Sequence, residues 1–117
     1  MRVPSLAGVA AVVRGYRFTY ATEVELQDGI AACLAGSGFE VEREVWLDDR
    51  RRVDLMVGRV AVEVKISGSA HEVERQVFGY LGCDGVDSVV LVTSRHSHLQ
   101  VEHPRVEVVS LTGGGLL

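Results

Sequence analysis

Cysteine, proline and lysine are scarce in this sequence of 117 residues. The two cysteines, Cys33 and Cys83, are too few for a disulfide framework and lack the spacing of a metal site. No apolar run approaches the roughly 20 residues that cross a bilayer. The apolar start of the chain is short and leads into Arg14 and Arg17 rather than a cleavage site, which argues against a signal peptide. We therefore expect a cytoplasmic protein with no membrane partner.

An excess of positive charge is also missing. The formal net charge is −4, which argues against a generic nucleic-acid binder held by a uniformly basic surface. Of the 12 basic residues only Lys65 is a lysine. Because a compact ammonium and a planar guanidinium are not interchangeable, Lys65 is a candidate for a specific chemical role. The hydrophobic content of 47% predicts an ordered chain.

The first third of the chain predicts one helix. Residues 1–18 have no clear period, and over Val9 to Val13 we expect an edge strand or an arm. A helix is predicted from about Glu23 to Leu34, because Thr22 and Glu25 have the spacing of a capping box and glycines follow the end of the segment.

Three strands should follow this helix. From Phe39 to Leu47 apolar and polar residues alternate, which predicts a half-buried strand with its apolar side chains on one face. Two further strands, about Arg52 to Val57 and Val60 to Ile66, are joined by Gly58-Arg59, a dipeptide that favours a type II′ hairpin turn.

The last third predicts a helix and two strands. A second capping box and a final glycine define a helix from about Ala70 to Leu81. A continuous apolar run from Val86 to Thr93 predicts a buried strand, which should lie parallel to the third strand after a right-handed crossover. An extra strand is expected over residues 105–111. The intervening stretch with His96, His98 and His103 is expected to be a polar loop rather than a zinc site.

The predicted order is αβββαβ, an α/β fold in which helices flank a central mixed sheet. One domain spans residues 1–117, with its core at about 20–93. Within it, the hairpin should place two carboxylates on one face. With Gly58-Arg59 as the loop, Asp54 lies opposite Glu63 with β-carbons about 5 Å apart, where like charges destabilise a sheet.

The two faces of the hairpin differ sharply. One face is expected to be wholly apolar, with Val53, Leu55, Val57, Val60, Val62, Val64 and Ile66. The other carries Arg52, Asp54, Met56, Ala61, Glu63 and Lys65. A divalent cation would resolve the conflict between the carboxylates, since Mg²⁺ and Mn²⁺ prefer hard oxygen ligands. The alternative is a salt bridge on a solvated face.

Val53-Asp54 followed by Glu63-Val64-Lys65, on a hairpin between two helices, resembles the core of the PD-(D/E)XK nuclease superfamily over residues 20–93. Val53 stands where the family's name has proline. The resemblance implies that Asp54 and Glu63 bind the metal ion together with the Val64 carbonyl, and that Lys65 is the catalytic lysine. It further implies a contribution from Glu23, for which the alternative is a first-turn carboxylate stabilised by the helix dipole.

The second helix carries a further resemblance. Arg75-Gln76 followed by Tyr80 is similar to the glutamine motif of RecB-type and Holliday-junction-resolvase-like members. Gln76 lies on an apolar stripe, where its amide needs a partner; either a metal-bound water, a substrate phosphate or the helix backbone would serve. Arg51, Arg52, Arg75 and Tyr80 are candidate contacts to nucleic acid, although an arginine run is usually a solvated turn.

The expected function is that of a Mg²⁺- or Mn²⁺-dependent DNA nuclease, in which a metal-activated water attacks the phosphodiester bond. Two alternatives remain. The chain would act as a resolvase of branched DNA, for which a homodimer with two sites is expected, or as a non-catalytic module that binds DNA or regulates a partner.

Overall fold

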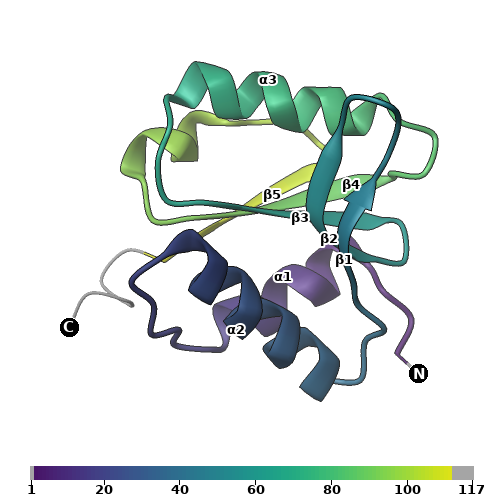
Figure 1. Cartoon of the computed structure of the whole chain (residues 1–117), viewed down its shortest axis with the longest axis vertical. Helices are drawn as coiled ribbons and strands as arrows, with labels where there is room; N and C mark the ends of the chain where they lie inside the picture. Colours follow the sequence, from purple (N-terminus) through teal and green to yellow (C-terminus); the bar gives the residue numbers. More distant parts are fainter. Residues whose placement is uncertain (1, 112–117) are drawn as a thin grey trace.

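The computed structural model describes residues 2–111 and contains a mixed five-stranded sheet with helices on both faces (Figure 1). Three consecutive strands pair antiparallel, β1 with β2 and β2 with β3: β1 (Glu42–Trp46), β2 (Arg52–Val57) and β3 (Val60–Lys65). They are followed by β4 (Ser88–Thr93) and β5 (Val106–Ser110), which continue the sheet parallel to β3 in the order β1-β2-β3-β4-β5. The predicted α/β class and mixed sheet are confirmed.

Three α-helices form the outer layers. In Figure 1, α1 (Leu6–Arg14) and α2 (Glu23–Gly36) lie below the sheet, and α3 (Ala70–Leu81) lies above it. A 3₁₀ helix, η1 (His96–Gln100), packs beside α3. None of the helices in residues 2–111 combines the length and the apolar character of a membrane span.

Local sequence signals determine where α2 and α3 begin. The Thr22 side chain accepts a hydrogen bond from the Glu25 amide, and the Glu25 carboxylate accepts one from the Thr22 amide. Ser69 and Glu72 make the same pair of bonds at the start of α3. Both capping boxes are confirmed, and each satisfies amides that the first turn of a helix leaves without a partner.

The N-terminal segment differs from the prediction. The edge strand or arm expected over Val9 to Val13 is wrong, because this stretch lies inside helix α1, which Ser5 caps. Val9, Ala10 and Val13 are buried at helical spacing against α2 and the sheet. The β-branched valines favour a strand locally, but burial of one helical face outweighs that preference.

The β2–β3 hairpin forms with the predicted turn, and the predicted register holds from the turn to Leu55 and Val62, but the strand pairing ends before the predicted pair of Asp54 with Glu63. Val57 pairs with Val60, Met56 with Ala61 and Leu55 with Val62. Gly58 has a φ of 59°, as the first central position of a type II′ turn requires. A Cβ on this glycine would lie 2.5 Å from Cγ of Pro4, so both backbone conformation and packing require glycine here.

The apolar side chains of β2 point to opposite faces of the sheet before and after Asp54. Leu55 and Val57 pack in the core between the sheet and the helices α1 and α2, whereas Val53 packs with Met56 in the core under α3. The prediction that Val53 shares a face with Leu55 and Val57 is therefore wrong.

The neighbouring strand changes side at the same level. Phe39 and Val41 belong to the core beside α1 and α2, and Val45 and Leu47 pack against the core under α3, so the predicted single face is wrong here too. Between the two pairs, Glu44 has a φ of 51°. This left-handed conformation is uncommon for a residue other than glycine. It lies where the apolar side chains of this segment switch from one core to the other, beside the part of β2 that carries Asp54.

Candidate functional site

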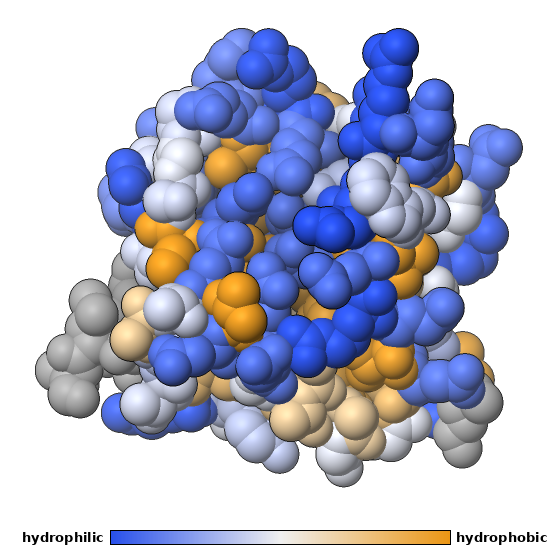
Figure 2. All heavy atoms as spheres, in the orientation of Figure 1, coloured by the Kyte–Doolittle hydropathy of each residue, from blue (hydrophilic) through white to orange (hydrophobic). Residues whose placement is uncertain are grey.

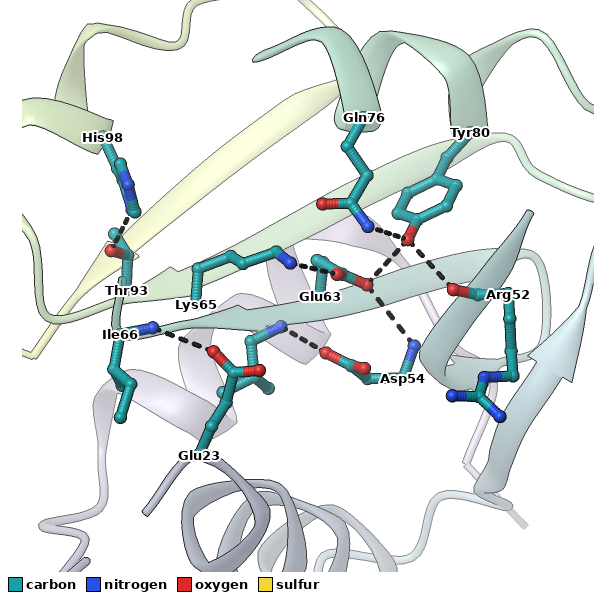
Figure 3. Close-up of polar contacts among 11 residues, drawn as sticks. Glu23, Arg52, Asp54, Glu63, Lys65, Ile66, Gln76, Tyr80, Thr93 and His98 are labelled. Atoms are coloured by element: carbon teal, nitrogen blue, oxygen red, sulfur yellow. Dashed lines mark hydrogen bonds and ion pairs between the residues drawn. The ribbon is translucent and has the colours of Figure 1, made fainter. Parts of the chain in front are cut away.

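Acidic side chains from three elements converge beside the β2–β3 hairpin (Figure 3). Asp54 comes from β2, Glu63 and Lys65 come from β3, and Glu23 comes from the first turn of α2. Gln76 and Tyr80 reach toward them from α3 on the opposite side. The structure thus gathers in one place the residues for which the sequence predicts a common site.

Carboxylates take the place of backbone partners where the hairpin passes the site. The Val64 amide donates to Asp54 Oδ2 at 2.8 Å, and the Asp54 amide donates to Glu63 Oε1 at 3.4 Å. On the side of α2, the Ile66 amide donates to Glu23 Oε1 at 3.1 Å. These contacts hold all three carboxylates against the backbone of the hairpin and of the residue that follows it.

Glu63 is the buried centre of the cluster, with only 2% of its surface exposed. Its Oε1 lies 3.0 Å from the Tyr80 hydroxyl, and its Oε2 lies 3.4 Å from Lys65 Nζ. The Tyr80 hydroxyl accepts a hydrogen bond from Gln76 Nε2 at 2.9 Å and also lies 3.1 Å from the carbonyl oxygen of Arg52. Helix α3 therefore holds Glu63 through a chain of two polar side chains.

The surroundings favour the neutral form of the acids. Burial raises the pKa of Glu63 to about 7, and the Asp54 charge adds to this effect while Lys65 opposes it. The pKa of Asp54 is also raised, first by burial and then by the charge of Glu23. Burial beside Glu63 raises the pKa of Tyr80, which therefore stays a neutral hydrogen-bond donor. Three carboxylates face one ammonium, a deficit of positive charge that a proton or a bound cation would relieve.

The remaining oxygens suit a hard divalent cation. Asp54 and Glu23 each use one carboxylate oxygen on a backbone amide, and within residues 2–111 no hydrogen bond occupies Asp54 Oδ1 or Glu23 Oε2. In the same residues, no group of three histidine, cysteine or acidic side chains is placed so that it could hold a metal ion by itself. Mg²⁺ needs no such cage, because it is usually held by one or two carboxylates together with waters and phosphate. The donor chemistry therefore fits Mg²⁺ or Mn²⁺.

A pocket of about 480 Å³ adjoins the site, lined in part by Lys65, Gln76 and Arg75. The pocket also borders the loop at Ser67 and Gly68, which leads from β3 into α3. Its volume is within the range of small-ligand pockets, and its charged lining residues are one lysine, one arginine and one carboxylate, Glu72. The molecular face seen in Figure 1 is largely hydrophilic, with only scattered apolar areas (Figure 2).

The remaining candidate contacts to nucleic acid are distributed unevenly. Arg51 pairs with Asp48 at 2.8 Å and lines a different pocket, beside Phe78 and Cys83. Arg52 is exposed at the start of β2, two residues before Asp54. Tyr80 is only 1% exposed, so its observed place is behind Glu63 rather than on a surface that nucleic acid would touch.

His98 is a buried polar residue that the sequence does not reveal. Its Nδ1 lies 2.6 Å from Thr93 Oγ1, and its Nε2 lies 2.9 Å from the carbonyl oxygen of Gly68. The expected polar loop is therefore wrong at this residue, which lies in η1 and is fully buried. His98 ties the end of β4 to the loop that follows Lys65. No local pattern distinguishes it from the exposed His96.

No protein-family model matches this sequence, and no curated protein or solved structure matches it. The functional conclusion therefore depends on the geometry and chemistry of the site.

Proposed function

We propose that this chain is a metal-dependent DNA nuclease of the PD-(D/E)XK type. Its catalytic site, which would hydrolyse phosphodiester bonds, consists of Asp54, Glu63 and Lys65. The observation that carries the proposal is a buried carboxylate, Glu63, and a half-buried one, Asp54, both with raised pKa values and beside the sole lysine of the chain. A sheet gains no stability from such a pair. Perturbed acids grouped beside a pocket are typical of catalytic sites.

Asp54, Glu63 and Glu23 would hold Mg²⁺ or Mn²⁺ together with the Val64 carbonyl. Such an ion lowers the pKa of a coordinated water and offsets the negative charge that builds on the phosphate. The oxygens of Asp54 and Glu23 that carry no hydrogen bond would bind the cation as they stand. Glu63 would bind it in place of its contact with Lys65.

The protein groups have separate tasks. Lys65 Nζ, 3.4 Å from Glu63, would orient the attacking water and stabilise charge in the transition state. Glu63, whose pKa is raised to about 7 by burial and by the Asp54 charge, would release its proton when the metal ion binds. Gln76 and Tyr80 would keep Glu63 in place, and Arg75 in the adjoining pocket would bind a phosphate next to the one that is cut.

The proposal is tested with linear duplex, single-stranded, supercoiled and four-way-junction DNA, each incubated with Mg²⁺, Mn²⁺ or EDTA. We expect cleavage that requires the metal and is lost in Asp54→Asn. Asp48→Asn is the matched control, since Asp48 is an exposed carboxylate paired with Arg51 outside the site. Preferential cutting of the junction would identify a resolvase. Binding without cleavage of any substrate would instead support a non-catalytic module.

Metal binding can be measured without turnover. Calorimetry with Mn²⁺ should show a site in the wild type that is lost in Asp54→Asn and in Glu63→Gln but retained in Asp48→Asn. Equal binding by all four proteins would contradict the assignment of these carboxylates as ligands.

A further inference from the structure

The only tryptophan of the chain lies exposed on the edge of the sheet near the candidate site. Trp46 ends β1 and keeps 61% of its surface exposed. It is paired across the strands with Arg52, whose guanidinium lies 5.6 Å from the centre of the indole ring. A large aromatic surface is thus held beside a cation at the beginning of β2.

The fold does not require an indole here. Val45 and Leu47, on either side of Trp46, pack against the core under α3, so the tryptophan between them remains outside that core. Arg52 is itself exposed and also pairs with Glu44 at 3.8 Å. An exposed cation–π contact stabilises a protein only slightly.

Trp46 is close to the acidic cluster through its strand partner. The carbonyl of Arg52 lies 3.1 Å from the Tyr80 hydroxyl, which also contacts Glu63 and Gln76. Two residues further along β2, Asp54 enters the site. A nucleic-acid strand with one phosphate at the acids would therefore place a neighbouring nucleotide within reach of the indole.

We propose that Trp46 and Arg52 form a stacking platform for an unpaired base of the strand that is cut. This inference rests on the proposed nuclease function and adds its substrate class, namely single-stranded or locally unpaired nucleic acid. An aromatic ring stacks on the face of any base, and a guanidinium adds a cation–π contact and a phosphate partner. In a continuous duplex the base faces are covered by neighbouring pairs.

Stacking would also provide affinity for nucleic acid to a protein that has little positive charge. A protein with a net charge of −4 gains little from a general attraction to phosphate. Contact between an indole and a base provides affinity that depends far less on salt than contact with phosphate does. Binding to single strands should therefore persist at salt concentrations that abolish binding to duplex DNA.

Intrinsic fluorescence gives a direct test, because Trp46 is the only indole in the chain. The wild-type protein is titrated in EDTA, which prevents metal-dependent cleavage, with a short single strand, an abasic strand of equal length, or a relaxed, covalently closed duplex circle. We expect saturable quenching of the emission by the intact strand only. Equal quenching by the abasic strand, or none by the intact strand, would overturn the platform.

Variants supply the second arm. Trp46→Ala should bind a labelled single strand roughly 5- to 150-fold more weakly, equivalent to about 1–3 kcal/mol, with Trp46→Phe between it and the wild type. Phe78→Ala is the matched control, because Phe78 is an exposed aromatic residue of α3 that packs against His103. It should leave the affinity unchanged, and thermal melting of each variant checks its fold.

The two proposals fail in different ways. Unchanged single-strand affinity in Trp46→Ala would reject the platform, whereas metal-dependent cleavage lost in Asp54→Asn would still support the nuclease. A wild-type protein that binds neither single strands nor duplex in EDTA would also reject the platform. The cleavage assay decides the nuclease function independently of either result.

Discussion

Replacing Glu63 with glutamine should stabilise the metal-free protein at alkaline pH, although it removes a central residue of the site. Glutamine has nearly the same shape and retains an oxygen that accepts hydrogen bonds from Tyr80 and the Asp54 amide. It removes the buried charge and its repulsion with Asp54. The ion pair with Lys65 is lost, but Lys65 is partly exposed and can be solvated.

The size of the effect follows from proton binding. Glu63 keeps its proton up to about pH 7 in the folded chain, and only up to about its ordinary pKa of 4.5 in the unfolded chain. Between these values the folded state binds more protons, so the free energy of unfolding falls as the pH rises, by about 1.4 kcal/mol per pH unit. The loss begins near pH 4.5, is complete above pH 7 and amounts to about 3 kcal/mol.

Urea unfolding in EDTA at pH 5, 6, 7 and 8 measures this loss. The difference between wild type and Glu63→Gln isolates the residue from other groups that titrate over the same range. This difference in the free energy of unfolding should shift in favour of Glu63→Gln as the pH rises. Added Mn²⁺ should stabilise the wild type but not Glu63→Gln. Glu42→Gln, an exposed carboxylate of β1, is the control and should follow the wild type. Parallel curves for wild type and Glu63→Gln would refute the raised pKa.

Substitutions at three further residues test the site and the buried polar contacts around it. Lys65→Arg and Lys65→Ala should bind DNA nearly normally but cut it at least ~100-fold more slowly, whereas Arg59→Ala, at the far turn of the hairpin, should cut normally; unchanged cleavage in both Lys65 variants would exclude a catalytic role. Tyr80→Phe should reduce the free energy of unfolding by about 1–2 kcal/mol, and it should raise the pKa of Glu63 further because the hydroxyl now lowers it. In urea melts, a loss confined to acid pH would contradict this assignment. His98→Ala should cost about 1–3 kcal/mol, since it removes the hydrogen bonds of the buried ring to Thr93 Oγ1 and to the Gly68 carbonyl, whereas the exposed His96→Ala should change stability by less than about 0.5 kcal/mol. Equal melts for the two histidine variants would argue against the proposed tie.

The parts of the fold that the sequence predicts well are those determined by short-range contacts. The capping boxes at Thr22 and Ser69 place the starts of α2 and α3, since both partners lie within one helical turn. Gly58-Arg59 fixes the hairpin register because a two-residue turn leaves no freedom in the pairing. That register brings Asp54 near Glu63 and Lys65, although the two acids meet through bonds between side chain and backbone and not as a strand pair.

Long-range packing explains where the predictions fail. Helix α1 forms from a valine-rich stretch because α2 and the sheet cover one of its faces, which no local pattern reveals. His98 is buried in contact with Thr93 and Gly68, which lie 5 and 30 residues earlier in the chain. The same holds for Tyr80, whose hydroxyl meets Glu63 only when α3 packs on the sheet. Sequence periodicity identifies its buried face but not the partner of its polar end.

The irregular part of the sheet coincides with the acidic cluster. At this level Val53 leaves the face of Leu55, Glu44 takes a left-handed backbone conformation, and Asp54 and Glu63 bond to the backbone of the opposite strand. The left-handed backbone of Glu44 and the closely placed charges of Asp54 and Glu63 cost stability, since strained backbone and desolvated like charges both raise the free energy of the folded state. A valine pair at positions 54 and 63 would continue the apolar hairpin without these costs. Stability alone therefore does not account for the acids, which supports the proposal that they perform a chemical task.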